Sequence, residues 1–249
     1  MKRAFPILAV LTALLLAYAF YEAIWVAPME RTMGDVQRIF YYHVPSAWTA
    51  FLLFFVNLVA SVIYLVRKNA AADAVAVVSA EVGVVFCTVV LVTGPIWARP
   101  VWGIWWTWDI RLTTTLVLWL IYVSYLVLRR FSDSSQTPKL AAVLAIFGAL
   151  DVPLVYFSIW FFRTQHPQPV IGGGGSIDPR MLHVLLINWL AFSCFAVLVC
   201  WARYRLEWLE RKIDEEQALE SLLGDGGSTA RSGRAQPPLD QTPSRSGHQ

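Results

Sequence analysis

The sequence is poor in charged residues. Only 15% of its 249 residues are Asp, Glu, Lys or Arg, against about a quarter in soluble domains. Hydrophobic residues make up 57% of the chain. This balance excludes an ordinary soluble domain and indicates a membrane protein.

Cysteine and the usual binding motifs are also scarce. Cys87, Cys194 and Cys200 fall inside apolar runs and lack the C-x-x-C spacing of a metal site. We interpret them as small core residues. The sequence contains no internal repeat, no phosphate-binding glycine loop and no basic patch for nucleic acid. We therefore expect no nucleic-acid partner.

Long apolar runs, in contrast, are abundant. A hydrocarbon core about 30 Å thick requires about 20 residues of helix. In lipid the backbone must satisfy its own hydrogen bonds, so each such run is expected to be a helix. The predicted spans are residues 5–26, 44–66, 74–96, 112–130, 139–162 and 182–202. The predicted fold class is an all-α, polytopic bundle of six transmembrane helices embedded in the lipid bilayer.

The first span could be either a cleaved signal peptide or a membrane anchor. Lys2 and Arg3 precede its apolar run, and the "AYA" of residues 17–19 resembles a cleavage site. The run continues through "FYEAIWV" without a polar break, which favours an uncleaved signal-anchor.

Orientation follows from the distribution of Lys and Arg. With a cytoplasmic N-terminus, the inner segments carry more of these residues than the outer loops, so both termini are predicted to be cytoplasmic. The outer loops still hold several arginines. Residues 1–212 form the predicted membrane domain. The tail, 213–249, is predicted to begin as a charged helix and to be disordered from Gly224, because it lacks large apolar residues.

Tryptophan is concentrated in one outer loop, in the string "VWGIWWTWDIRLT" of residues 101–113. If Pro100 begins a short helix, three of the tryptophans and the following aspartate lie on one face. Such a face suits a flat aromatic ligand, although tryptophan also forms the aromatic belt at membrane interfaces. The candidate residues are Trp102, Trp105, Trp106, Trp108 and Asp109.

Histidines occur at the same outer face. His43 and His183 lie at the outer ends of the second and sixth predicted spans, and His166 lies in the outer loop after the fifth. Each alone is more often structural than a ligand. Two at helix ends could together bind one metal, and imidazole is a common axial ligand of haem. Propionates would then require arginine partners. The candidates on that side are Arg99, Arg111, Arg163 and Arg180.

Two acidic residues, Glu81 and Asp151, fall at membrane depth. Inserting a charge there costs about 2.5–3.5 kcal/mol. We predict that each forms a hydrogen bond within the bundle, and a proton or substrate path is the alternative.

The string "WGIWWTWDIRLT" resembles the WWD motif of the haem-handling proteins of cytochrome c maturation. Residues 20–205, including "YYHVPSAW", "TGPIWARPVWG" and "DVPLVYFSIWFF", resemble the CcmC family. The resemblance implies a protein of the bacterial inner membrane that is not an enzyme. It would bind haem b at the periplasmic face and present it to the haem chaperone CcmE, working with the CcmA and CcmB transporter pair and CcmD.

The resemblance also implies that His43 and His183 ligate the haem iron and that the WWD segment forms a haem platform and part of the chaperone docking surface. The fifth loop departs from the family pattern: "IWFFRTQHP" lacks the family's Glu and the Gln after its His. The role of His166 therefore stays open.

Two other functions would leave different patterns. A permease that exports haem or another solute would need polar or broken helices along a path. A b-type electron-transfer protein would bury haem between helices, with histidines at membrane depth. The sequence favours a haem-presenting protein, because both candidate ligands lie at helix ends.

Overall fold

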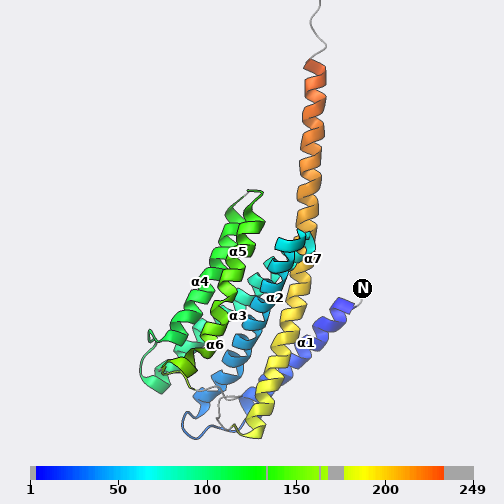
Figure 1. Ribbon diagram of the computed structural model, residues 1–249. Coiled ribbons are helices and arrows are strands. Elements are labelled where there is room, and N and C mark those ends of the chain that lie inside the picture. The colour runs from blue at the N-terminus through cyan, green and yellow to red at the C-terminus, as the bar shows by residue number, and fades with distance from the viewer. Residues whose placement is uncertain (1–3, 133, 163, 168–176, 233–249) are drawn as a thin grey trace, which may run out of the picture. The chain divides into compact units, whose positions relative to one another are not determined.

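The computed structural model describes residues 4–132, 134–162, 164–167 and 177–232, with the backbone alone for 222–232. Helices dominate these residues (Figure 1). Seven α-helices are named α1–α7, and two short turns, a π-helical η1 and a 3-10 η2, lie between α1 and α2. The bounds are α1 Ala4–Tyr21, η1 Glu22–Val26, η2 Asp35–Ile39, α2 Phe40–Arg67, α3 Ala70–Trp102, α4 Ile110–Phe131, α5 Thr137–Ala149, α6 Asp151–Phe161 and α7 Pro179–Ser232.

The described chain contains six helical stretches that are long and apolar enough to cross a membrane. They are Ala4–Val26, Asp35–Arg67, Ala70–Trp102, Ile110–Phe131, Thr137–Phe161 and Pro179–Ser221. The prediction of six transmembrane helices is confirmed.

The ends of α1, α3 and α6 and the starts of α2, α4 and α7 lie together at one end of the bundle (Figure 1). We call this the loop end. Inside the bundle, Phe54 of α2 stacks on Tyr122 of α4, with ring centroids 3.9 Å apart. Gly83 of α3 permits this close packing, because a Cβ there would lie 2.7 Å from the Phe54 ring. The helices that reach the loop end are thereby held by a tightly packed core.

Ion pairs also join the helices. Arg129 of α4 donates two hydrogen bonds, of 2.8 and 2.7 Å, to the buried Asp73 carboxylate of α3. Glu81 of α3 pairs with Arg203 of α7 at 2.8 Å, so the predicted bonding of Glu81 within the bundle is confirmed. One carboxylate oxygen of Asp151 is buried and has no hydrogen-bond partner among the described residues.

Proline and glycine explain two breaks that the predicted spans did not contain. The fifth span is divided at Leu150 into α5 and α6, because Pro153 has no N–H to donate to Ala149 and its ring crowds that carbonyl. At the loop end, α3 already includes Pro100 and ends at Gly103, whose φ of 79° is left-handed. The predicted short helix from Pro100 is therefore wrong: residues 103–109 form a non-helical link.

The chain divides into two compact units, Met1–Arg205 and Leu206–Gln249. In the second unit α7 continues as the predicted charged helix, where Arg211 pairs with Glu207 one turn earlier at 2.9 Å. The helix runs past Gly224 to Ser232, and residues 233–249 of the predicted tail lie outside the described residues.

Candidate functional site

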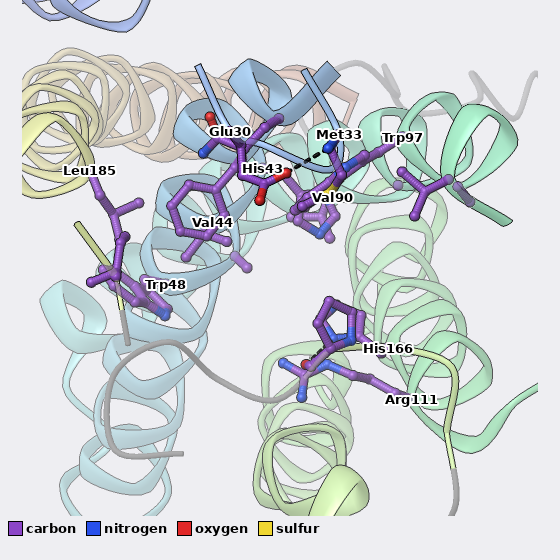
Figure 2. Close-up of a pocket in the computed structure, with 18 of the residues that line it drawn as sticks. Glu30, Met33, His43, Val44, Trp48, Val90, Trp97, Arg111, His166 and Leu185 are labelled. Atoms are coloured by element: carbon purple, nitrogen blue, oxygen red, sulfur yellow. Dashed lines mark hydrogen bonds between the residues drawn. The ribbon is translucent and has the colours of Figure 1, made fainter. Parts of the chain in front are cut away.

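A cavity of about 1120 Å³ occupies the loop end. This volume is slightly above the roughly 300–1,000 Å³ typical of small-molecule sites. Its walls come from α2, α3, α4, α6 and α7 and from the links between them. Figure 2 shows His43 facing the cavity on one side, with His166 and Arg111 on another. The cavity therefore brings together two imidazoles and a guanidinium from three separate parts of the chain.

His43 is buried in the first turn of α2, with 8% of its surface exposed. Its ring meets Trp97 of α3 edge to face, with centroids 5.8 Å apart. Its Nδ1 lies 2.8 Å from the hydroxyl of Thr93. Gly94 packs beside the ring, because a Cβ at that position would lie 3.5 Å from Cε1 of His43, and both residues line the cavity.

The hydrogen bonds of Thr93 fix the tautomer of His43. The Thr93 hydroxyl donates its only proton to the carbonyl of Val89 at 2.7 Å. It must then accept from Nδ1–H of His43. In the neutral imidazole the other nitrogen, Nε2, therefore carries a free lone pair, which is the form that binds a metal.

His166 reaches the cavity from the link between α6 and α7. Its Nδ1 donates to the carbonyl of Pro167 at 2.9 Å, so Nε2 of this ring is also unprotonated. Burial, with a contribution from Arg111, lowers the pKa of His166 to about 4. The imidazole is consequently neutral at pH 7, and its lone pair is available.

Asp109 holds this link in place. One of its carboxylate oxygens accepts from the backbone N–H of Leu112 at 3.0 Å and caps the start of α4. The other accepts from the hydroxyl of Thr164 at 2.8 Å, and the Thr164 oxygen accepts from the backbone N–H of His166 at 3.0 Å. The aspartate of the WWD segment thus positions a histidine more than fifty residues away in the sequence.

Arg111, two residues after Asp109, lines the cavity. Its Nη1 is buried and has no hydrogen-bond partner among the described residues. The indole N–H groups of Trp97 and Trp106, which also line the cavity, are likewise unpaired within the described part of the chain. Because unpaired buried donors are costly, the cavity suits a ligand with carboxylate oxygens.

The other candidate arginines are placed differently. Arg180 lines the cavity and pairs with Asp178 at 2.9 Å. Arg99 is exposed, is absent from the lining and donates to the carbonyl of Gly103 at the end of α3. Arg163 lies outside the described residues.

The four tryptophans of residues 101–113 divide into two pairs. Trp102 and Trp106 line the cavity. Trp105 and Trp108 do not, and 59% and 76% of their surfaces are exposed. Trp106 and Trp108 meet edge to face, with centroids 5.8 Å apart, which connects the two pairs. One pair can touch a ligand in the cavity while the other faces outward.

His183 is exposed on α7 and is not among the residues that line the cavity. His166, and not the His183 expected from the sequence, lines the cavity together with His43. The sequence predicted that His166 lies on the same side of the membrane as His43, but only the contacts of Thr164 and Asp109 show that its link folds back into the cavity.

A flat ligand with a metal at its centre and carboxylates at its edge fits these residues. Two neutral imidazoles offer Nε2 atoms, and aromatic rings line the walls. Arg111 and Trp106 offer donors that no other described residue pairs with. The haem expected from the sequence has this shape and charge.

Comparison with known proteins agrees with this description. A family model described as CcmC, Heme exporter protein C, matches residues 1–219. The Heme exporter protein C of Bradyrhizobium diazoefficiens is 36% identical over 222 residues, which cover 88% of this chain and 84% of that protein. That of Haemophilus influenzae is 33% identical over 208 residues, covering 82% and 85%. A ccmC-like mitochondrial protein of Marchantia polymorpha, named for cytochrome c biosynthesis, is 34% identical over 179 residues, covering 72% and 76%.

Proposed function

The chain belongs to the CcmC, Heme exporter protein C, family, and from this premise we propose that it binds haem b as cargo and presents it to the chaperone CcmE. Members of the family are components of haem transport and cytochrome c maturation, and we propose no enzymatic reaction at the site. Binding, orientation and release of haem are the tasks of the cavity.

The observation that carries the proposal is the pair of imidazoles, His43 and His166, that line one cavity with Nε2 free. Haem iron takes one or two axial nitrogen ligands. Thr93 and the carbonyl of Pro167 hold the two rings in the required tautomer, and Asp109 holds the link that carries His166. Such outer contacts orient ligands and raise their basicity.

The propionates at the edge of haem would accept hydrogen bonds from the donors that line the cavity. Arg111 is the propionate partner that the geometry favours most, because its Nη1 is buried and unpaired among the described residues. Trp106, which also lines the cavity, adds a buried indole N–H that has no partner among the described residues. Arg180 is a second candidate, weakened by its pairing with Asp178.

His183 remains a prediction from the sequence. Its exposure and its absence from the cavity lining lead us to propose His166 as the partner of His43. Haem binding by the His166→Ala and His183→Ala variants distinguishes the pair His43 and His166 from the pair His43 and His183.

Presentation to a partner requires an outward surface beside the site. Trp105 and Trp108 supply exposed aromatic area next to the cavity, and exposed aromatic residues are favoured at protein interfaces. We propose that this pair docks CcmE at the periplasmic face of the inner membrane, with both termini in the cytoplasm and with CcmA, CcmB and CcmD as further partners. The distribution of Lys and Arg supports this orientation.

Two double variants test binding and presentation separately. Trp102→Ala with Trp106→Ala should reduce the haem that copurifies with the protein, because both residues line the cavity. Trp105→Ala with Trp108→Ala should leave bound haem unchanged but reduce haem attached to CcmE, detected by haem staining of the chaperone. Loss of bound haem from the exposed pair alone, or a wild-type protein without haem, contradicts the proposal.

A further inference from the structure

The cavity continues from the polar loop end toward the middle of the membrane. Its lining runs along α2 from Phe40 to Phe51 and along α3 from Trp102 to Cys87. At 1.5 Å per residue these stretches are about 16 and 22 Å long. Half of a hydrocarbon core is about 15 Å. The inner part of the cavity, which is lined by apolar side chains, therefore lies at the depth of the lipid chains.

One wall of the inner cavity belongs to the lipid-facing side of α7. Leu186, Leu190 and Val197 are spaced along one exposed stripe of the helix. Leu186 is 41% exposed and also lines the cavity, whereas Leu190 and Val197 do not line it. Leu186 therefore lies where the cavity wall and the lipid-facing surface meet.

A second wall, on α6, shows the same combination. Tyr156 lines the cavity and is 36% exposed, while its neighbour Phe157 is exposed without lining it. Tyr156 is about 8 Å along α6 from Phe161, and Leu186 is about 10 Å along α7 from Pro179. Each edge residue therefore lies two to three helical turns at most from the end of its own helix at the loop end.

A tryptophan pair lies one turn further in. Trp189 of α7 lines the cavity, is 37% exposed and meets Trp48 of α2 edge to face, with centroids 5.4 Å apart. Figure 2 shows Trp48 on the same side of the cavity as Leu185 of α7. The inner edge of this wall is therefore aromatic and in contact with α2.

We propose that the cavity opens sideways into the bilayer between α6 and α7, and that haem enters from the lipid through this lateral opening, edged by Tyr156, Leu186 and Trp189. The inference rests on the proposed function and adds the source of the ligand. A porphyrin ring partitions into hydrocarbon, while its propionates stay near the polar boundary. Entry from the side lets the ring remain in apolar surroundings while the propionates reach Arg111 at the loop end.

Loading kinetics in proteoliposomes test the opening. The full chain is reconstituted without haem and mixed with vesicles of the same lipid that contain haem, and the growth of the Soret band is followed. Leu186→Trp should slow loading several-fold and leave the final occupancy unchanged. Leu190→Trp is the matched control, because it adds the same bulk on the same exposed stripe away from the cavity, and it should load like wild type.

A second position guards against a local folding defect at Leu186. Tyr156→Trp should also slow loading, and its control Phe157→Trp should not. Wild-type rates in both Leu186→Trp and Tyr156→Trp, or equal slowing by the controls, overturn the lateral opening even if haem binds normally at equilibrium. A wild-type chain that never acquires a Soret band overturns the proposed function instead, so the two failures are distinguishable.

Discussion

Substitution of Thr93 by valine tests how the protein prepares His43 for haem. Valine has nearly the shape of threonine but cannot accept the proton of His43 Nδ1, which lies 2.8 Å from the Thr93 hydroxyl. His43 is buried, so water does not readily replace the lost acceptor. The neutral ring can then move its proton to Nε2, which blocks the nitrogen that faces the ligand.

The expected loss follows from the role of such outer contacts. Removing a hydrogen-bond partner of a metal-binding histidine typically costs 10–100-fold in affinity, or about 1.4–2.7 kcal/mol. We expect Thr93→Val to weaken haem binding by about this factor, while Thr93→Ser, which keeps the hydroxyl, should bind close to wild type. The measurement is a titration of the haem-free protein in detergent with haem, followed by absorbance.

Another threonine provides the control. Thr115 lines the cavity, and its hydroxyl donates to the carbonyl of Arg111 at 2.8 Å without a histidine contact. Thr115→Val should leave the affinity nearly unchanged. Wild-type affinity in Thr93→Val, or an equal loss in Thr115→Val, would refute the reasoning.

Four further variants and a pH series test other contacts of the site. Arg111→Gln should weaken haem binding in the same titration, because it removes the cavity cation whose Nη1 has no partner in the described part of the chain. The exposed Arg99→Gln should not weaken binding, and equal effects would contradict the assignment. Asp109→Ala should lower the haem affinity, and it should lower the free energy of unfolding by about 1 kcal/mol because the helix cap is lost. Thr164→Val, which leaves the cap, should lower affinity alone. The pKa of His166, about 4 in the folded protein, lies below its unfolded value of roughly 6.5. Its contribution to stability is therefore present above pH 6.5 and is lost as pH falls toward 4. As pH falls over that range, the midpoint temperature of thermal unfolding of the haem-free protein should decrease more steeply in wild type than in His166→Gln. Parallel curves for the two proteins would show that protonation of His166 does not affect stability.

The membrane spans were predictable because length and apolarity determine them. A backbone in lipid has few alternatives to a helix, and each of the six predicted runs corresponds to a helical stretch that is long enough to cross. The division of the fifth span at Leu150 was less visible, because proline occurs within membrane helices without always breaking them. Pro95 and Pro100 in α3 are examples.

The WWD segment shows where local periodicity fails. The helical arrangement predicted from Pro100 depended on a helix starting there, whereas α3 arrives already formed and ends at Gly103. The tryptophans are instead divided by an irregular link into a cavity-lining pair and an exposed pair. Backbone conformation in such a link depends on tertiary contacts that spacing does not encode.

The histidines show a limit of topology. Topology predicted that His43, His166 and His183 lie on one side of the membrane, and it favoured His43 and His183 because they lie at helix ends. The side-chain contacts that distinguish them are long-range: Thr93 lies fifty residues from His43, and Asp109 lies fifty-five from Thr164. Sequence position alone cannot reveal which face of a helix or which turn of a link meets the cavity.

The central claim is that His43 and His166 bind haem in one cavity. The most direct measurement is the absorption spectrum of the protein purified in detergent from haem-replete cells, compared with His43→Ala, His166→Ala and His183→Ala. The account predicts a Soret band in wild type that is lost or shifted in the first two variants and unchanged in His183→Ala. An unchanged band in His166→Ala together with a lost band in His183→Ala would contradict it.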